Sequence, residues 1–203
     1  MIPRLRYTPY HKFRKTERTP EENRRRDEVN DRHAETDHAK MREAIVAYVR
    51  KTGGRVLLGP EMTYELDLLA PLLYDPLPAD VKPSVAIRRD YWLTDEAAAV
   101  YRRAAAVLSF ECHSPILASV QGTPGIYVRQ PEDGIKGQMW NDVGLGDWYV
   151  DNVETATGAS IAARVLGIVG NPQGSRRKVR AAVDKAQSLH AVGAKAIRSA
   201  ISG

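Results

Sequence analysis

The sequence predicts an α/β fold in which a parallel sheet is flanked by helices, with a helical extension at the carboxyl end. Up to about residue 150, short apolar segments typical of buried strands alternate with segments of helical periodicity. Proline and glycine residues separate these segments, and helical patterns alone follow Asp151. Short strands that alternate with helices are typical of a doubly wound parallel sheet.

The first quarter of the chain is expected to contain a clipped strand, a long loop and a helix. The strand covers residues 2–6, and residues 8–31 are polar without apolar periodicity, which predicts a loop. From His38 onward, apolar residues recur at helical spacing, and a glycine pair that begins at Gly53 ends this helix. The next strand covers residues 55–58.

Helices and strands continue to alternate through the middle of the chain. The strands are expected at residues 84–87, 107–110 and 126–128, and the helices before them at residues 64–73, 94–105 and 114–122. Thr94 is a good N-cap for the second of these helices, and Ser114 as N-cap with Pro115 as first residue begins the third. We therefore expect one domain in residues 1–150, followed in residues 151–203 by helices that pack on it or extend from it.

The composition indicates a globular chain. Hydrophobic residues make up 43% of the 203 residues and charged residues 27%, close to the average for globular domains, and a chain of this length can bury a sizeable core. No apolar run reaches the roughly 18 residues of a membrane span, and the first residues lack the apolar region of a signal peptide, so we expect a cytoplasmic protein. Cys112 is the single cysteine, which excludes an internal disulfide and a cysteine-cluster metal site.

The distribution of charge argues against a nucleic-acid partner. The net charge of +5 weakly favours a polyanion or a phosphorylated small molecule. Much of the basic excess lies in the first fifty residues, where acidic residues are interleaved with it. Such a mixture is typical of a solvated helix face or a mobile loop.

Ligands of an open parallel sheet bind outside the carboxyl ends of its strands. This rule selects five segments, which are residues 4–10, 59–62, 88–90, 111–114 and 129–136. Arg88 and Arg89 end a strand and could bind a phosphate or carboxylate between them. Lys136 lies in a glycine-flanked loop that could bind an anion. Each of these residues could equally be a solvated surface residue. Glu61 and Asp67 fit no metal-ligand spacing, and we expect neither a metal nor a cofactor.

The loop from Glu111 to Pro115 is the most informative of these segments. His113 lies beside the positive end of a helix dipole, which lowers imidazole basicity and favours anionic ligands, and the Ser114 amide contributes to this field. Glu111 could orient His113 or act itself as acid or base; the alternative is a loop histidine hydrogen-bonded to backbone. Cys112 is expected to be a buried residue without a nucleophilic role. The sequence contains no GxGxxG, P-loop or GxSxG motif, so nicotinamide, ATPase and serine-hydrolase functions lack their usual signals.

Four stretches of the chain occur in a distinctive order. They are Phe110-Glu-Cys-His-Ser-Pro-Ile-Leu-Ala118, Gly122-Thr-Pro-Gly-Ile-Tyr-Val128, Lys136-Gly-Gln-Met-Trp140 and Asp142-Val-Gly-Leu-Gly-Asp-Trp148. Together they resemble the polysaccharide pyruvyl transferase family, whose second half carries an arginine-x-histidine motif, a helix, a glycine-x-proline turn, a strand, a lysine and an aspartate-glycine-leucine run. The resemblance covers most of residues 2–150 and implies one Rossmann-like half of a GT-B-like two-domain architecture. It further implies transfer of pyruvyl from phosphoenolpyruvate to a sugar of a cell-surface polysaccharide, in which His113 exchanges protons with the phosphoenolpyruvate methylene or the acceptor hydroxyl.

Two departures from the family pattern bear on the site. Glu111 stands where the family usually has arginine, so the anion contact is absent or comes from Arg88, Arg89, Arg129 or the strand that carries Arg4 and Arg6. We expect the Glu111 carboxylate to pair with an arginine, with Arg88 or Arg89 as the nearer candidates. Residues 2–7 resemble the first strand of the family's second half, which implies that the first half is missing and that this chain alone is inactive.

Three functions stay open at this point. Beside pyruvyl transfer, the same loops could hold the diphosphate of a nucleotide-sugar in a GT-B-like glycosyltransferase, or the chain could be a non-catalytic module that binds a sugar or an anion. We predict that the loops carrying Arg88, Arg89, His113 and Lys136 converge on one shared anion site. The strands ending near Leu58, Ile87, Phe110 and Val128 are predicted to be parallel neighbours, with His113 at their carboxyl edge.

Overall fold

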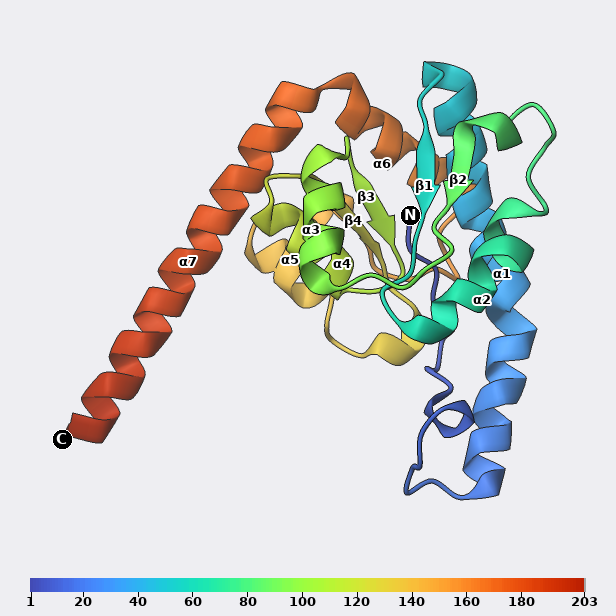
Figure 1. Cartoon of the computed structure of the whole chain (residues 1–203). Helices are drawn as coiled ribbons and strands as arrows, with labels where there is room; N and C mark the ends of the chain where they lie inside the picture. The colour runs from blue at the N-terminus through green and yellow to red at the C-terminus, as the bar shows by residue number, and fades with distance from the viewer. Residues whose placement is uncertain (203) are drawn as a thin grey trace.

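The computed structural model describes residues 1–202 and has parallel strands flanked by helices, the α/β architecture that the sequence predicts (Figure 1). The strands are β1 (Val56–Leu58), β2 (Val85–Ile87), β3 (Val107–Ser109), β4 (Gly125–Val128) and β5 (Tyr149–Val150). β1 pairs with β2, and β3, β4 and β5 pair in that order; every one of these pairs is parallel.

The first two residues join the two sheets. The Met1 nitrogen donates to the Leu57 carbonyl at 2.7 Å, and the Gly59 amide donates to the Met1 carbonyl at 3.0 Å. On the other side, the Ile2 amide donates to the Leu108 carbonyl at 3.0 Å. The spatial order is therefore β2, β1, residues 1–2, β3, β4, β5, which is the 3-2-1-4-5-6 order of a Rossmann-like sheet.

The predicted parallel pairing is confirmed within each sheet, with one difference: residues 1–2 separate β1 from β3. The predicted strand at residues 2–6 is wrong, because only Ile2 forms a β-bridge and residues 3–6 are not in a strand. Pro3 has no amide hydrogen for a ladder, and the side chains of Arg4 and Arg6 turn inward to buried carboxylates.

The remaining elements are helices and turns. The helices are α1 (Pro20–Thr52), α2 (Leu66–Leu68) continued by a π-helical segment (Leu69–Tyr74), α3 (Thr94–Arg103), α4 (His113–Val120), α5 (Gln138–Asp142), α6 (Gly158–Gly170) and α7 (Pro172–Ser202). Turns of 3-10 helix cover Tyr10–Lys12, Thr63–Glu65, Lys82–Ser84, Pro131–Asp133 and Gly146–Trp148. α4 packs on β3 and β4, α1 packs along α6, and α7 contacts α4 and α6 before it extends away from the body (Figure 1). Within residues 1–202, no helix is both long and apolar enough to cross a membrane.

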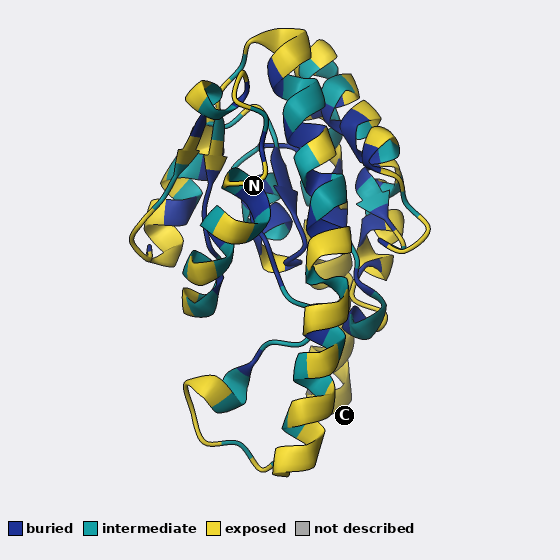
Figure 2. Cartoon of the chain, turned by 90° about the vertical axis from the view of Figure 1, so that its right-hand side faces the viewer, coloured by how far each residue is buried: buried dark blue, intermediate teal, exposed yellow. Residues whose placement is uncertain are grey.

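The largest correction concerns the loop predicted for residues 8–31, because residues 20–31 belong to α1. Thr19 and Glu22 form a capping box in which each side chain accepts from the other's backbone amide, and Pro20 is the first helical residue. These polar interactions begin the helix in a segment that has no apolar stripe, and its first turns are largely exposed (Figure 2).

Two predicted N-caps are also wrong: the N-cap of α3 is Leu93, one residue before Thr94, and that of α4 is Cys112, two residues before Ser114. α3 includes Thr94, and α4 begins at His113, one residue before Ser114. Carboxylates supply the capping in both cases: Glu96 accepts from the Leu93 amide, and Glu61 accepts from the Ser114 amide.

Candidate functional site

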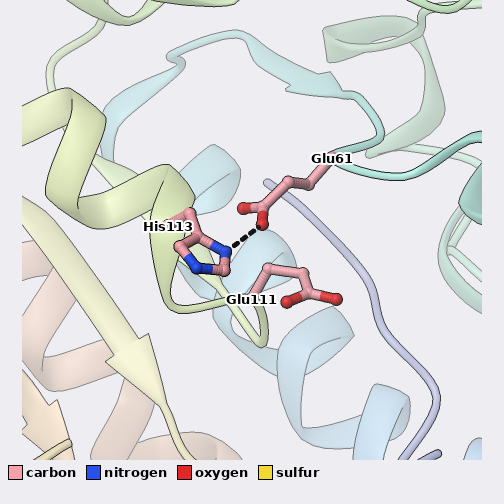
Figure 3. A group of neighbouring side chains, drawn as sticks. All are labelled: Glu61, Glu111 and His113. Carbon is pink, nitrogen blue, oxygen red and sulfur yellow. Dashed lines mark hydrogen bonds and ion pairs between the residues drawn. The ribbon is translucent and has the colours of Figure 1, made fainter. Parts of the chain in front are cut away.

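Two loops at the carboxyl edge of the sheet bring three titratable side chains together. Glu61 follows β1, whereas Glu111 and His113 follow β3 (Figure 3). One ligand atom from each of the three lies within 4.8 Å of the others. The predicted position of His113 at the carboxyl edge is therefore confirmed, and its neighbour across the sheet is Glu61.

Glu61 holds His113 in one orientation. His113 Nδ1 lies 2.8 Å from Glu61 Oε1, and the histidine side chain is 72% exposed. A carboxylate accepts hydrogen bonds, so Nδ1 is the donor in this contact, and in the neutral tautomer with this donor the free lone pair lies on Nε2. This arrangement is suited to accepting a proton from a bound hydroxyl group.

The same Glu61 carboxylate occupies the amino end of α4. Its Oε2 accepts from the Ser114 amide at 2.8 Å and from Ser114 Oγ at 2.6 Å, while Tyr101 Oη lies 2.9 Å from Ser114 Oγ. Ser114 is buried. The amino end of α4 was predicted to favour a substrate anion. In the structure its Ser114 amide already donates to the Glu61 carboxylate.

Glu111 is buried and paired with an arginine, as predicted, but the partner is Arg4 and not Arg88 or Arg89. Arg4 Nε lies 2.9 Å from Glu111 Oε1, and the same guanidinium pairs with Asp133. Burial opposes the charge of Arg4, but the Glu111 and Asp133 carboxylates outweigh this effect and raise its pKa. The prediction failed because Arg4 enters this edge from a segment more than a hundred residues away in sequence.

Glu65 adds a fourth acid beside this group. It is fully buried, and its Oε2 accepts from the Glu61 amide at 2.6 Å and the Met62 amide at 3.1 Å. Burial, followed by the charge of Glu111, raises the pKa of Glu65 well above its ordinary value, and burial also raises the pKa of Glu111. Of Glu65 and Glu111, Glu65 is the more deeply buried, and burial is the first cause that raises the pKa of each.

Two predicted substrate-binding arginines serve the fold. Arg6 is buried and forms a bidentate pair with Asp37 at 2.9 and 3.1 Å, with a further contact to Glu154 at 2.6 Å. Arg129 donates to the carbonyls of Asp151 at 2.6 Å and Gly134 at 3.1 Å. Both guanidinium groups are thus engaged by the protein itself.

The other three predicted cations remain accessible. Arg88 is half-buried; its Nε donates to the Asp90 carbonyl at 3.0 Å and its guanidinium lies 5.0 Å from the Trp92 ring, whereas Arg89 and Lys136 are exposed. The charge of Lys136 acts to lower the pKa of the Cys112 thiol, an effect that burial outweighs. Convergence of all four loops on one anion stays a prediction. Cys112 itself is buried, and burial raises its pKa to about 11, in agreement with its expected passive role.

A pocket of about 350 Å³ opens beside His113 and Glu61. Its wall includes Tyr91, Trp92 and Tyr101, and the Tyr91 side chain is exposed. Pockets of this size with a few converging polar groups are typical ligand sites. A larger cavity of about 480 Å³ is lined mostly by apolar residues around β1 and β3, which offer little to a polar substrate.

Sequence reasoning missed Tyr91, Trp92 and Glu65 and gave Glu61 no role. A readable signal existed for Glu61, since it lies in a segment selected by the strand-end rule. Tyr91 and Trp92 directly follow another selected segment, residues 88–90.

Comparison with known proteins found similarity to solved structures only. No protein-family model matches the sequence, and no curated protein matches it. A solved structure described as "Crystal Structure Analysis of the Glycotransferase of kitacinnamycin" has 13% sequence identity and a TM-score of 0.47, over 76% of this chain and 38% of that chain. This chain thus spans well under half the length of that structure.

Proposed function

We propose that this chain is one half of a two-domain, GT-B-like transferase that transfers pyruvyl from phosphoenolpyruvate to a sugar. The observation that carries the proposal is the His113–Glu61 pair, which leaves an exposed imidazole nitrogen at the mouth of an aromatic-lined pocket. The sugar would lie in this pocket against Tyr91 and Trp92. The motif order from Phe110 to Trp148 supports phosphoenolpyruvate as donor.

The proposed chemistry needs one base that can return its proton. His113 Nε2 accepts the proton of a sugar hydroxyl as its oxygen attacks C2 of phosphoenolpyruvate, and the methylene carbon takes up that proton to become a methyl group. A second hydroxyl then displaces phosphate, and its proton leaves with the phosphate. The product is a ketal-linked pyruvate, and Glu61 stabilises the imidazolium that forms between the steps.

The local charges support donor binding of modest affinity. Phosphoenolpyruvate carries a phosphate and a carboxylate, and the accessible cations for them are Arg88, Arg89 and Lys136. Arg4 contributes little, because Glu111 and Asp133 already neutralise it. A second Rossmann-like half would supply the opposite wall and further cations.

Binding of the donor tests the proposal directly. We expect phosphoenolpyruvate to shift the side-chain NMR signals of His113 saturably, and Lys136→Ala and the Arg88→Ala, Arg89→Ala pair to weaken this binding several-fold. Arg198→Ala, an exposed arginine on α7, is the matched control and should leave the affinity unchanged. Preference for a nucleoside diphosphate would replace the proposal by a nucleotide-sugar glycosyltransferase. Binding of a sugar without either donor would leave a non-catalytic module.

Turnover by this chain alone is not expected. A transferase holds donor and acceptor within reacting distance between both walls of its cleft, and only one wall is formed here. Phosphate release from phosphoenolpyruvate with a sugar acceptor should match that of a His113→Ala control. Release well above the control would contradict the need for a second half.

A further inference from the structure

The carboxyl edge contains more acid than its cations can balance. Glu61, Glu65, Glu111 and Asp133 lie in one connected group, and Arg4 is the buried cation among them. The ligand atoms of Glu61, Glu111 and His113 approach one another within 4.8 Å. Ligand atoms at about 2.1 Å from a tetrahedral Zn²⁺ ion lie roughly 3.3 Å apart, so the three side chains would close on the ion by about 1.5 Å at most.

An unpartnered buried oxygen points to the same place. Glu65 is fully buried, and its Oε1 has no hydrogen-bond partner among the described residues. Its other oxygen accepts from the amides of Glu61 and Met62, so the Glu65 carboxyl group lies directly against the segment that carries Glu61. A buried carboxyl oxygen without a partner is rare in folded proteins and is commonly explained by an ion or an ordered water beside it.

We propose that Glu61, Glu111 and His113 bind one divalent transition-metal ion, such as Zn²⁺ or Mn²⁺, at the carboxyl edge of the sheet. An imidazole nitrogen with two carboxylates suits these ions, whereas Mg²⁺ prefers oxygen ligands and water. Glu65 is an outer partner of this site, because its Oε2 accepts from the Glu61 amide at 2.6 Å and fixes the backbone that carries the Glu61 ligand.

His113 is the ligand that can move most readily. His113 and Glu61 are joined by one hydrogen bond at 2.8 Å, and the His113 side chain is 72% exposed. Arg4 pairs with Oε1 of Glu111, which leaves Oε2 of that carboxylate for the ion. An ion between Nδ1 and Glu61 would therefore replace that hydrogen bond without breaking the buried pair.

Metal binding also changes the state of His113. An imidazole that ligates through Nδ1 carries its proton on Nε2 and cannot accept another there. If the proposed function holds, the ion would switch off proton transfer by His113. The metal site itself does not depend on that function, because binding is measured without substrate.

Titration of the chelator-treated full chain tests the site. We expect one equivalent of Zn²⁺ to bind by calorimetry, and Co²⁺ as a probe to give the visible absorption of a nitrogen-ligated site. His113→Ala and Glu61→Gln should each weaken binding by about tenfold or more, in the range found for ligand-shell changes. His190→Ala, an exposed histidine on α7, should leave the affinity unchanged, and Mg²⁺ should bind much more weakly than Zn²⁺.

His113→Ala is the decisive variant, because the exposed side chain can be removed without disturbing the core. Glu61→Gln also weakens the cap of α4, so circular dichroism must first show that this variant folds. Absence of saturable Zn²⁺ binding by the wild type, or binding that ignores His113→Ala, would overturn the proposal. Loss of binding in His190→Ala would equally overturn it.

Discussion

Replacing Arg4 by methionine should be strongly destabilising, because it leaves two buried carboxylates without their cation. Arg4 Nε lies 2.9 Å from Glu111, a separation at which opposite charges attract by about 6 kcal/mol for an effective dielectric constant of 20. Desolvation of the charges offsets much of this attraction, and removal of one partner from a buried pair typically costs about 3–5 kcal/mol. We expect Arg4→Met to lower the free energy of unfolding by that amount, a large part of the roughly 5–15 kcal/mol of an ordinary domain.

The assay is urea unfolding followed by circular dichroism at two pH values. Burial raises the pKa of Glu111 and Arg4 opposes this rise, so without Arg4 the pKa of Glu111 in the folded protein rises further above the unfolded value, and the folded state binds more protons between those two values. The variant should therefore recover stability relative to wild type as the pH falls from 8 to 5. Arg89→Met, at an exposed arginine, should change stability by no more than about 0.5 kcal/mol. A loss below about 1 kcal/mol for Arg4→Met, or a loss independent of pH, would refute the reasoning.

Two further predictions concern buried titratable groups. Burial lowers the pKa of His38 from 6.5 to about 4, so the unfolded state binds more protons below pH 6.5. The free energy of unfolding should therefore be unaffected by His38 above pH 6.5 and fall by about 3 kcal/mol as the pH drops toward 4. In urea unfolding over this range, the free energy of unfolding of His38→Leu should depend less steeply on pH than that of the wild type. An identical dependence on pH would contradict a buried, neutral His38. Because burial raises the pKa of Cys112 to about 11, thiol labelling of the native protein at pH 8 should be on the order of a hundredfold slower than after unfolding in urea. Equal labelling rates would show an accessible, reactive thiol instead.

Much of the fold was predictable because its signals are local. The apolar runs at β1, β2, β3 and β4 and the turn residues between them specify strands that a doubly wound sheet can bury. The strand-end rule then selected the loops with Glu61 and His113 before their contact was known. The start of α1 was also predictable, since the Thr19–Glu22 capping box is a sequence signal. The lack of apolar periodicity in residues 8–31 led instead to the prediction of a loop.

The pairing of charged groups was not predictable in the same way. Glu61 and His113 are separated by 52 residues and meet only because residues 1–2 bring β1 and β3 together. Arg4 reaches Glu111 because the chain leaves the sheet after Ile2 and turns its side chain inward. Neither partner carries a local signal that names the other.

The sequence by itself determined the alternation of strands and helices, the carboxyl-edge loops and the position of His113 at the start of a helix. Tertiary structure alone decided which carboxylate orients His113, which arginine neutralises Glu111, and that Glu65 lies buried behind them. The physical reason is how far apart in the sequence the interacting residues lie. Strand and helix formation depend on neighbours a few residues away, whereas burial and ion pairing depend on the packing of segments that are distant in the chain.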